Sequence, residues 1–281
     1  MAVINGLVTL AEWKNYKTAP GQTFTTDATD DAVIEGLIEG ASRYFEGECA
    51  GRTFYPRVET RSYDVPENNW LFVDDDLLAV TTLTNGDDAA IASTEYTTRP
   101  YNYSPKYAIV IRDSSDTIWE WDSNSSSEAV IDVLGYWGYH DQYTLRAWKA
   151  GGTLNEATNL NASDLTFTMT AGHSVVAGNV IRCESELMIV TGVSTNDITV
   201  NKRGDNGSTA ATHADGTAVT IWQAMDDVRQ AVLEISRNSY SRRYGVNETG
   251  AAIVSPGGVV VGPADVSEFA ARTIRRLRRT V

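Results

Sequence analysis

Few residues in this chain have the types and spacing that catalysis requires. The three histidines, His140, His173 and His213, are scattered, and none has a cysteine or carboxylate at the spacing of a metal site. The patterns G-x-S-x-G, Walker A, G-x-G-x-x-G and H-E-x-x-H are absent. Because no nucleophile is paired with a base, we expect no enzyme, no cofactor and no catalytic or metal site.

Three other groups of residues invite a chemical interpretation. The run Asp74-Asp75-Asp76 could bind a cation, but it has no fourth carboxylate at a fixed offset and no EF-hand pattern, so we interpret it as a solvated turn. Arg203-Gly204-Asp205 is an adhesion tripeptide in other settings, yet it lies here in a Gly- and Asn-rich turn. Cys49 and Cys183 are far apart and are predicted to be buried thiols.

Charge is unevenly distributed along the chain. The net charge is −14, which argues against a protein that grips nucleic acid over its whole surface. Five arginines lie within the last ten residues, and without them the remainder would stand at −14 − 5 = −19. An acidic body with a basic terminus favours a docking element for an acidic partner, and a frayed, solvated terminus is the alternative. These arginines are Arg272, Arg275, Arg276, Arg278 and Arg279.

A long amphipathic helix is predicted between Asp27 and Gly51. Its apolar face comprises Ile34, Leu37, Ile38, Ala41, Phe45 and Cys49, and the carboxylates Asp31, Glu35, Glu39 and Glu46 fall on or near the opposite face. Like charges four residues apart are mildly destabilising in a helix. The acidic stripe therefore indicates either a well-solvated face or a functional need for negative charge.

The remaining pattern places helices at both ends and strands between them. A short helix is predicted at 9–17, and two further helices are predicted at 224–244 and 265–279. Period-two alternation predicts strands at 57–65, 70–73, 77–83, 95–99, 107–112 and 129–135. A small-residue linker from Ala150 then leads into an all-β insert with strands at 165–170, 180–184, 186–193, 198–201 and 218–222.

This order predicts an α+β fold: a helical-bundle core, formed by N-terminal helices and two C-terminal helices, with antiparallel strands and an all-β insertion domain. We divide the chain into 1–149, the first part of the core with the antiparallel β region; 150–222, the inserted β-domain; 223–264, the second part of the core and a loop; and 265–281, the C-terminal docking helix and tail.

No run approaches the roughly 18 apolar residues of a membrane span, so no membrane partner is expected.

With the helices placed, the chain resembles the head–tail connector (adaptor, or head-completion) proteins of tailed bacteriophages. The matching stretches are Val8–Lys14, similar to the family's opening "vTleevK"; Ile34–Tyr55, with the run LIEGASRYFEGECAGRTFY; and Asp227–Arg243. The insert resembles a β-module of phage structural proteins through Val180–Met188 and KRGDNGSTAATHADGTAV. The chain departs from the pattern at Met225, where many relatives have proline, and by carrying the insert at all.

The resemblance implies a structural protein of the virion neck that is assembled in the host cytoplasm. It implies a ring, usually of twelve copies, that lies beneath the portal protein, extends the DNA channel and takes part in genome packaging and ejection. The next neck or tail-completion protein would bind below it, and double-stranded DNA would pass through without sequence-specific binding. Two residue sets follow. The portal-docking set is Phe269, Arg272, Arg275, Arg276, Leu277, Arg278 and Arg279, and the acidic channel face is Asp31, Glu35, Glu39 and Glu46.

Two other functional classes remain open at this point. One is a receptor- or carbohydrate-binding virion component that uses the β-insert, and the other is a hydrolase of unknown type. Aromatic residues suit a sugar platform, but they more often fill strands or anchor interfaces. The candidates for such a platform are Trp119, Trp121, Tyr136, Trp137 and Tyr139.

Overall fold

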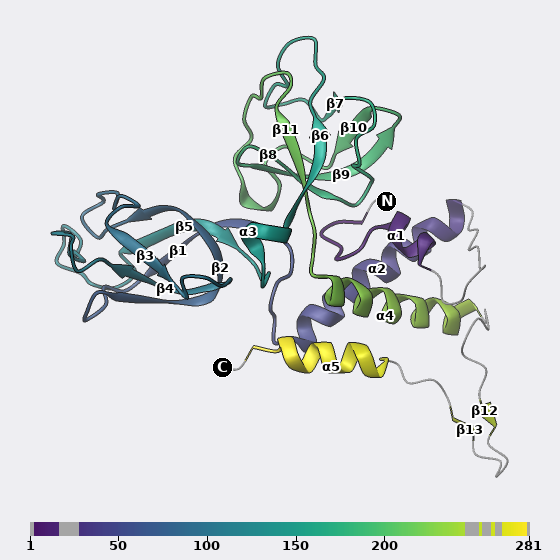
Figure 1. Cartoon of the computed structure of the whole chain (residues 1–281), viewed down its shortest axis with the longest axis horizontal. Coiled ribbons are helices and arrows are strands. Elements are labelled where there is room, and N and C mark those ends of the chain that lie inside the picture. Colours follow the sequence, from purple (N-terminus) through teal and green to yellow (C-terminus); the bar gives the residue numbers. More distant parts are fainter. Residues whose placement is uncertain (1–2, 17–27, 245–252, 255–259, 262–265, 280–281) are drawn as a thin grey trace.

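The structure is a computed structural model that describes residues 3–16, 28–244, 253–254, 260–261 and 266–279. The fold is mixed α+β with antiparallel sheets, and strands hold more of the chain than helices do. Figure 1 shows a group of helices, a five-stranded sheet on one side of it and a six-stranded sheet above it. The helices are α1 (Leu10–Asn15), α2 (Ala28–Glu48), α3 (Tyr143–Arg146), α4 (Asp226–Tyr244) and α5 (Glu268–Leu277).

The ends of α1 and α2 follow local sequence signals. The Thr9 hydroxyl accepts a hydrogen bond from the Glu12 amide at 3.2 Å, and the Glu12 carboxylate accepts one from the Thr9 amide at 2.7 Å. This confirms the predicted capping box. After α2, Gly51 has a φ of +74° and donates its amide to the Glu46 carbonyl at 3.0 Å. A glycine is suited to this left-handed position because it has no Cβ.

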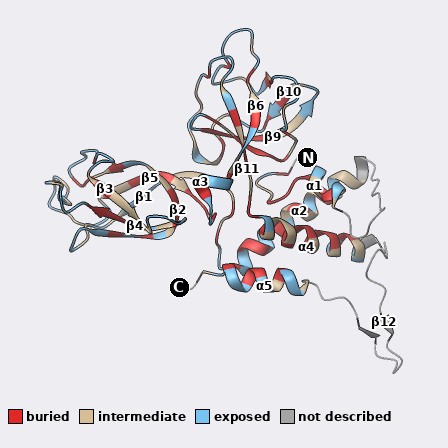
Figure 2. Cartoon of the chain, in the orientation of Figure 1, coloured by how far each residue is buried: buried red, intermediate tan, exposed pale blue. Residues whose placement is uncertain are grey.

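Helix α4 lies at the centre of the helical group and is buried on most of its surface (Figure 2). Helices α2 and α5 both pack against it, and α1 packs against α2. The predicted apolar face of α2 points inward, with Ile34, Ile38 and Phe45 fully buried. Trp13 of α1 lies edge-on against Tyr240 of α4 with ring centroids 5.2 Å apart. One apolar core therefore joins residues from both ends of the sequence.

The five-stranded sheet has the strand order β1-β5-β2-β4-β3. The first half of β2 pairs with β4, Trp70 facing Val110, and its second half pairs with β5, Leu77 facing Trp137. The two halves that were predicted as separate strands are thus one irregular strand, and the three aspartates lie within it. The strands are β1 (Arg57–Tyr63), β2 (Trp70–Thr84), β3 (Tyr96–Arg99), β4 (Lys106–Ile111) and β5 (Ile131–Trp137).

The six-stranded sheet, β6-β11-β8-β9-β10-β7, is formed by the insert. Its first strand was predicted as part of a linker because Gly151 and Gly152 break the strand pattern. A Cβ on Gly151 would lie 3.0 Å from the Val219 carbonyl oxygen, so glycine permits the close approach of β6 and β11. The strands are β6 (Trp148–Thr153), β7 (Thr166–Thr168), β8 (Val180–Cys183), β9 (Glu186–Ser194), β10 (Asp197–Val200) and β11 (Ala218–Trp222), with a short 3-10 turn, η1 (Asp205–Gly207), before β11.

The insert is held to the other two parts by specific contacts. The Trp222 indole donates to the Phe54 carbonyl at 3.0 Å. A Cβ on Gly207 would lie 2.1 Å from the Val58 carbonyl oxygen, so only glycine allows η1 to contact β1. Asn206 exchanges two side-chain hydrogen bonds with Asn5 at 2.8 and 2.9 Å. A further pair of two-residue strands, β12 (Ile253–Val254) and β13 (Val260–Val261), lies in the predicted loop 250–263, most of which is outside the described residues.

Candidate docking site at the C-terminal helix

Helix α5 has one face packed on the chain and one face directed outward. The Ser267 hydroxyl caps its start by accepting the Ala270 amide at 3.0 Å. Ala270, Thr273, Ile274 and Leu277 are buried against the helical core. Ala270, Ile274 and Leu277 belong to the same apolar core as residues of α2 and α4. The helix is therefore an integral part of the core.

The end of α5 is fixed to the segment that follows α2. Arg52 donates to the Leu277 carbonyl at 2.6 Å, and the Arg279 amide donates to the Cys49 carbonyl at 3.3 Å. The Arg52 guanidinium also lies over the Tyr139 ring, 4.1 Å from its centroid. These contacts supply hydrogen-bond partners for carbonyl groups that a helix end leaves free. They hold the C-terminal segment beside the bend in β2.

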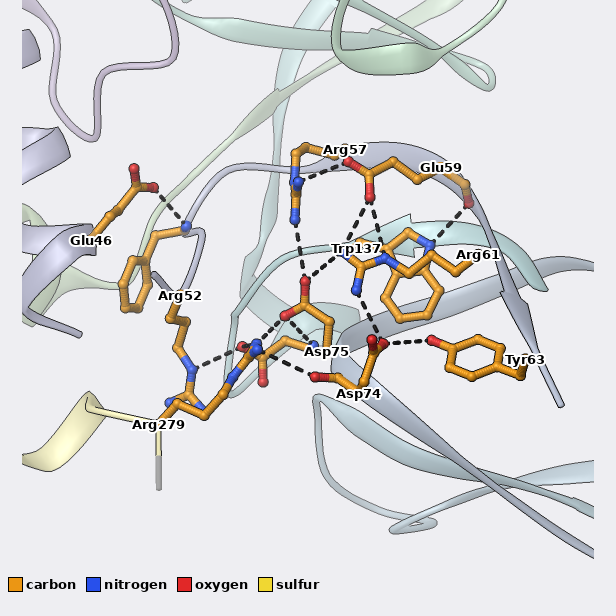
Figure 3. Close-up of polar contacts among 12 residues, drawn as sticks. Glu46, Arg52, Arg57, Glu59, Arg61, Tyr63, Asp74, Asp75, Trp137 and Arg279 are labelled. Atoms are coloured by element: carbon orange, nitrogen blue, oxygen red, sulfur yellow. Dashed lines mark hydrogen bonds and ion pairs between the residues drawn. The ribbon is translucent and has the colours of Figure 1, made fainter. Parts of the chain in front are cut away.

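This segment contacts aspartates of β2, and Figure 3 shows Arg279 beside Asp74 and Asp75. Asp76 is 1% exposed and pairs with Arg52 at 2.8 Å and with Arg279 at 3.1 Å. Arg279 also pairs with Asp75. The prediction of a solvated turn was therefore wrong for Asp75 and Asp76, because arginines from distant parts of the sequence neutralise them. Only Asp74 keeps a largely exposed side chain.

Two further arginines complete this cluster from β1. Arg57 and Arg61 lie 3.3 and 2.6 Å from the Asp75 carboxylate, and both also pair with Glu59. Burial opposes the charged form of Asp75, but the Asp76 amide and the Arg279 and Arg61 guanidinium groups outweigh it and lower the pKa of Asp75. The cluster is thus an ion-pair network that joins the five-stranded sheet to the C-terminal segment.

The structure divides the predicted portal-docking residues into two groups. Leu277 is 3% exposed and Arg279 is engaged by its own chain, so these two are not presented to a partner. The outward face of α5 carries Phe269, which is 43% exposed, and Arg272, Arg275 and Arg276; exposed Arg278 follows as the C-cap residue. Of these, Arg272 pairs with Glu268 and Arg276 pairs with Asp227. Arg275 and Arg278 are exposed, and neither has an ion-pair partner among the described residues.

The predicted acidic face of α2 is largely used within the chain. Glu46 is 8% exposed and accepts the Phe54 amide at 3.0 Å, so placing it on the solvated face was wrong. Burial raises the pKa of Glu46, with Arg43 opposing that shift. Asp31 pairs with Lys14 at 2.6 Å, and Glu39 accepts the Ile4 amide at 2.7 Å.

Asp31, Glu35 and Glu39 are half-buried at the sides of α2. Its exposed positions include the small residues Ala32, Gly36 and Gly40, and also Arg43, Tyr44 and Glu48. The sequence placed the carboxylates opposite the apolar face, and the structure shows that they border the helix surface that faces solvent.

A second buried network holds the insert together around Glu186. One carboxylate oxygen accepts Arg203 Nε at 2.8 Å and the Gly204 amide at 2.9 Å. The other accepts Arg203 Nη2 at 2.7 Å, the Ala211 amide at 3.0 Å and His213 Nε2 at 2.8 Å. Burial opposes the charge, but these donors outweigh it and lower the pKa of Glu186.

These are the residues through which the insert resembles the phage β-module, and they have a structural role here. The side chain of Arg203 is 4% exposed and Asp205 is 2% exposed. Asp205 accepts the Ile189 amide at 3.0 Å. The tripeptide Arg203-Gly204-Asp205 is therefore folded inward and does not present an adhesion surface.

The aromatic residues considered as a sugar platform do not lie together. Trp137 is fully buried beneath Arg61, and Tyr139 packs against the helical core. Trp121 is exposed, whereas Trp119 packs against the interior of the five-stranded sheet and Tyr136 packs beside α3 and the insert. The insert's own aromatic side chains, Phe167 and Trp222, are both buried.

Sequence reasoning missed a different exposed aromatic group, formed by Trp70, Phe72 and Tyr101. The alternation of Trp70, Phe72 and buried Leu71 along the first half of β2 was the signal that could have identified it.

The groups considered for chemistry are isolated from one another. His140 is buried against Trp222, and burial lowers its pKa. Burial raises the pKa of Cys49 and of Cys183 to about 12, and the two are free thiols. Within the described residues, no group of three or more His, Cys, Asp or Glu side chains is placed to hold a metal ion.

No helix in the described part of the chain is long and apolar enough to cross a membrane. No known family profile and no curated protein sequence matches this chain.

Proposed function

We propose that this chain is a structural subunit of the head–tail connector of a tailed bacteriophage. In this proposal, twelve copies form a ring beneath the portal, and the ring extends the DNA channel and joins the head to the next neck or tail-completion protein. The four packed helices α1, α2, α4 and α5 are its helical-bundle core, with two sheets projecting from it. The protein works without a cofactor or catalysis and resides in the virion neck after assembly in the host cytoplasm.

The observation that carries the proposal is the two-faced helix α5. Its inner face is fixed to the core, so its outer face is presented rigidly. The exposed residues are the phenyl ring of Phe269 and the guanidinium groups of Arg275 and Arg278, which have no ion-pair partner among the described residues. Such a surface suits an acidic partner, because guanidinium groups form charge-assisted, often bidentate, hydrogen bonds with carboxylates. The partner in this proposal is the portal protein.

The charge of the chain supports a channel through which DNA slides. A net charge of −14 disfavours the counterion-release binding that a basic wall would give. We assign the channel-facing role to Asp31, Glu35 and Glu39, whose side chains are half-buried, and we leave out buried Glu46. DNA contact in this assignment is repulsive and independent of sequence.

The proposal is tested by reversing charge on α5 without disturbing its buried face. The double variant Arg275→Glu, Arg278→Glu should lose at least about tenfold in affinity for the portal ring, measured by co-sedimentation. The matched control reverses two exposed basic residues elsewhere, Arg146→Glu and Lys149→Glu. Deleting the whole segment 265–281 is a poorer test, because it also removes buried Leu277.

Equal portal binding by the α5 variant and by wild type would refute the docking role. Equal loss in the α5 variant and in the control would show that the effect comes from net charge and not from this surface.

A further inference from the structure

The outer face of the five-stranded sheet carries an exposed aromatic cluster. Trp70 and Phe72 are 39% and 68% exposed and stack with ring centroids 5.9 Å apart. Arg99 lies over the Tyr101 ring, 3.4 Å from its centroid, and 5.8 Å from that of Trp70. Register places these side chains on one face, because Phe72 and Arg99 both pair with Ala108. We call Trp70, Phe72, Arg99 and Tyr101 the aromatic ledge.

The ledge is held in a fixed arrangement. The Lys106 ammonium donates to the carbonyls of Pro100 and Tyr103 at 2.7 Å each and of Tyr101 at 3.0 Å. These bonds tie the β3–β4 loop to the first residue of β4. A surface that is already ordered loses less conformational entropy when it binds.

The composition of the ledge is that of a protein-binding hot spot, since tryptophan, tyrosine and arginine dominate such sites. Arg99 forms no ion pair within the described residues, and its guanidinium is held by two rings instead. A partner that supplies a carboxylate beside an apolar side chain would pair with the Arg99 guanidinium and pack on the aromatic rings.

The same chain presents such a surface elsewhere on the part that contains the five-stranded sheet. Along the segment after β4, Asp116, Ile118 and Glu120 are exposed while the residues between them are half-buried, which is the alternation of extended chain. Ile118 is 64% exposed. We call Asp116, Ile118 and Glu120 the acidic ridge.

The acidic ridge is also fixed in place. The buried Asn85 side chain donates to the Ile118 carbonyl at 2.9 Å and accepts the Glu120 amide at 2.9 Å. A Cβ on Gly86 would lie 2.1 Å from the Glu120 carbonyl oxygen, so the ridge contacts the end of β2 at a position where only glycine fits. The predicted Asn85-Gly86 turn therefore positions the ridge.

We propose that the aromatic ledge of one copy docks on the acidic ridge of the next copy. An apolar side chain between two carboxylates complements a guanidinium among aromatic rings in both charge and polarity. Ledge-to-ledge pairing would oppose two Arg99 guanidinium groups, so a two-fold dimer through the ledge is disfavoured. Two different surfaces in contact form a heterologous interface, which generates a ring when the rotation closes. This inference rests on the proposed ring and names a contact that builds it.

Disulfide trapping tests the pairing directly. Proteins carrying Phe72→Cys and Ile118→Cys, when mixed and mildly oxidised, should form a mixed dimer in clear excess over either same-variant dimer. The native thiols contribute little background, because Cys49 and Cys183 are fully buried. A predominant Phe72→Cys homodimer, or no mixed product, would overturn the proposal.

Charge reversal tests the same contact by sedimentation velocity, with and without the portal ring. Arg99→Glu should weaken self-association at least about tenfold, and adding Glu120→Arg should restore most of it. Restoration also shows that the variant folds. Portal-bound rings that form normally with Arg99→Glu would overturn this interface and leave the connector function standing. Wild-type protein that never self-associates, even on the portal, would refute both. Quenching of Trp70 fluorescence by oligosaccharides without self-association would assign the ledge to sugars instead.

Discussion

Replacing Glu186 by glutamine should severely destabilise the insert. The carboxylate is fully buried, and each of its oxygens accepts at least two hydrogen bonds. A glutamine amide nitrogen would face donors in either orientation, and the buried Arg203 guanidinium would lose its counter-charge. Removing one member of a buried ion pair costs about 3–5 kcal/mol, so we expect a loss of that size in the free energy of unfolding of the insert.

Hydrogen exchange at the amides of Gly204 and Ala211, combined with urea unfolding, would measure this loss. Glu184→Gln is the matched control, because Glu184 contacts the other nitrogen of His213 at 2.8 Å from an exposed position. The control should cost less than about 1 kcal/mol. If Glu186→Gln costs no more than Glu184→Gln, the argument that this network holds the insert together is refuted.

Three further predictions concern the core, the thiols and the Asp75 carboxylate. Leu277→Ala should lower the free energy of unfolding, measured by urea titration, by about 2–5 kcal/mol. Phe269→Ala, at an exposed position, should change it by less than about 0.5 kcal/mol. Equal effects of the two variants would show that α5 does not pack on the core. Cys49 and Cys183 should resist a thiol reagent in the folded protein at pH 8, and rapid labelling would contradict their burial. Because the pKa of Asp75 is lowered, its charge stabilises the folded protein above the ordinary aspartate pKa of 3.8, and this stabilisation is lost as the pH falls through the lowered pKa. The free energy of unfolding of Asp75→Asn should therefore depend less on pH in that range. An unchanged acid-unfolding profile would contradict this.

Local sequence signals predicted the elements well where the signal and its partner are close together. Thr9 and Glu12 are three residues apart, and their capping box is present. The inward face of α2 and the burial of both cysteines also followed from residue type and helical period. Strand β6 was missed because Gly151 and Gly152 have no strand propensity, and the need for close packing against β11 is visible only in the fold.

The contacts that form the candidate site join residues far apart in the sequence, so the local residue pattern did not predict them. Asp76 is paired with Arg279, 203 residues away, so nothing near it in the sequence indicated that it would be buried. Glu46 points inward because the chain turns back after Gly51 and presents the Phe54 amide to it. Helical period alone assigned it to the wrong side. The docking residues of α5 were chosen from the sequence because they are arginines and apolar residues. The structure shows which of them are exposed and which are buried or paired within the chain.

Imaging purified chain bound to the portal ring is the measurement that tests the connector function most directly. The proposal predicts a closed ring of about a dozen subunits, coaxial with the portal and enclosing a continuous channel, with α5 at the contact. A stable trimer would favour a fibre-like binder instead. Monomers scattered over the portal surface, or no complex at all, would contradict the proposed function.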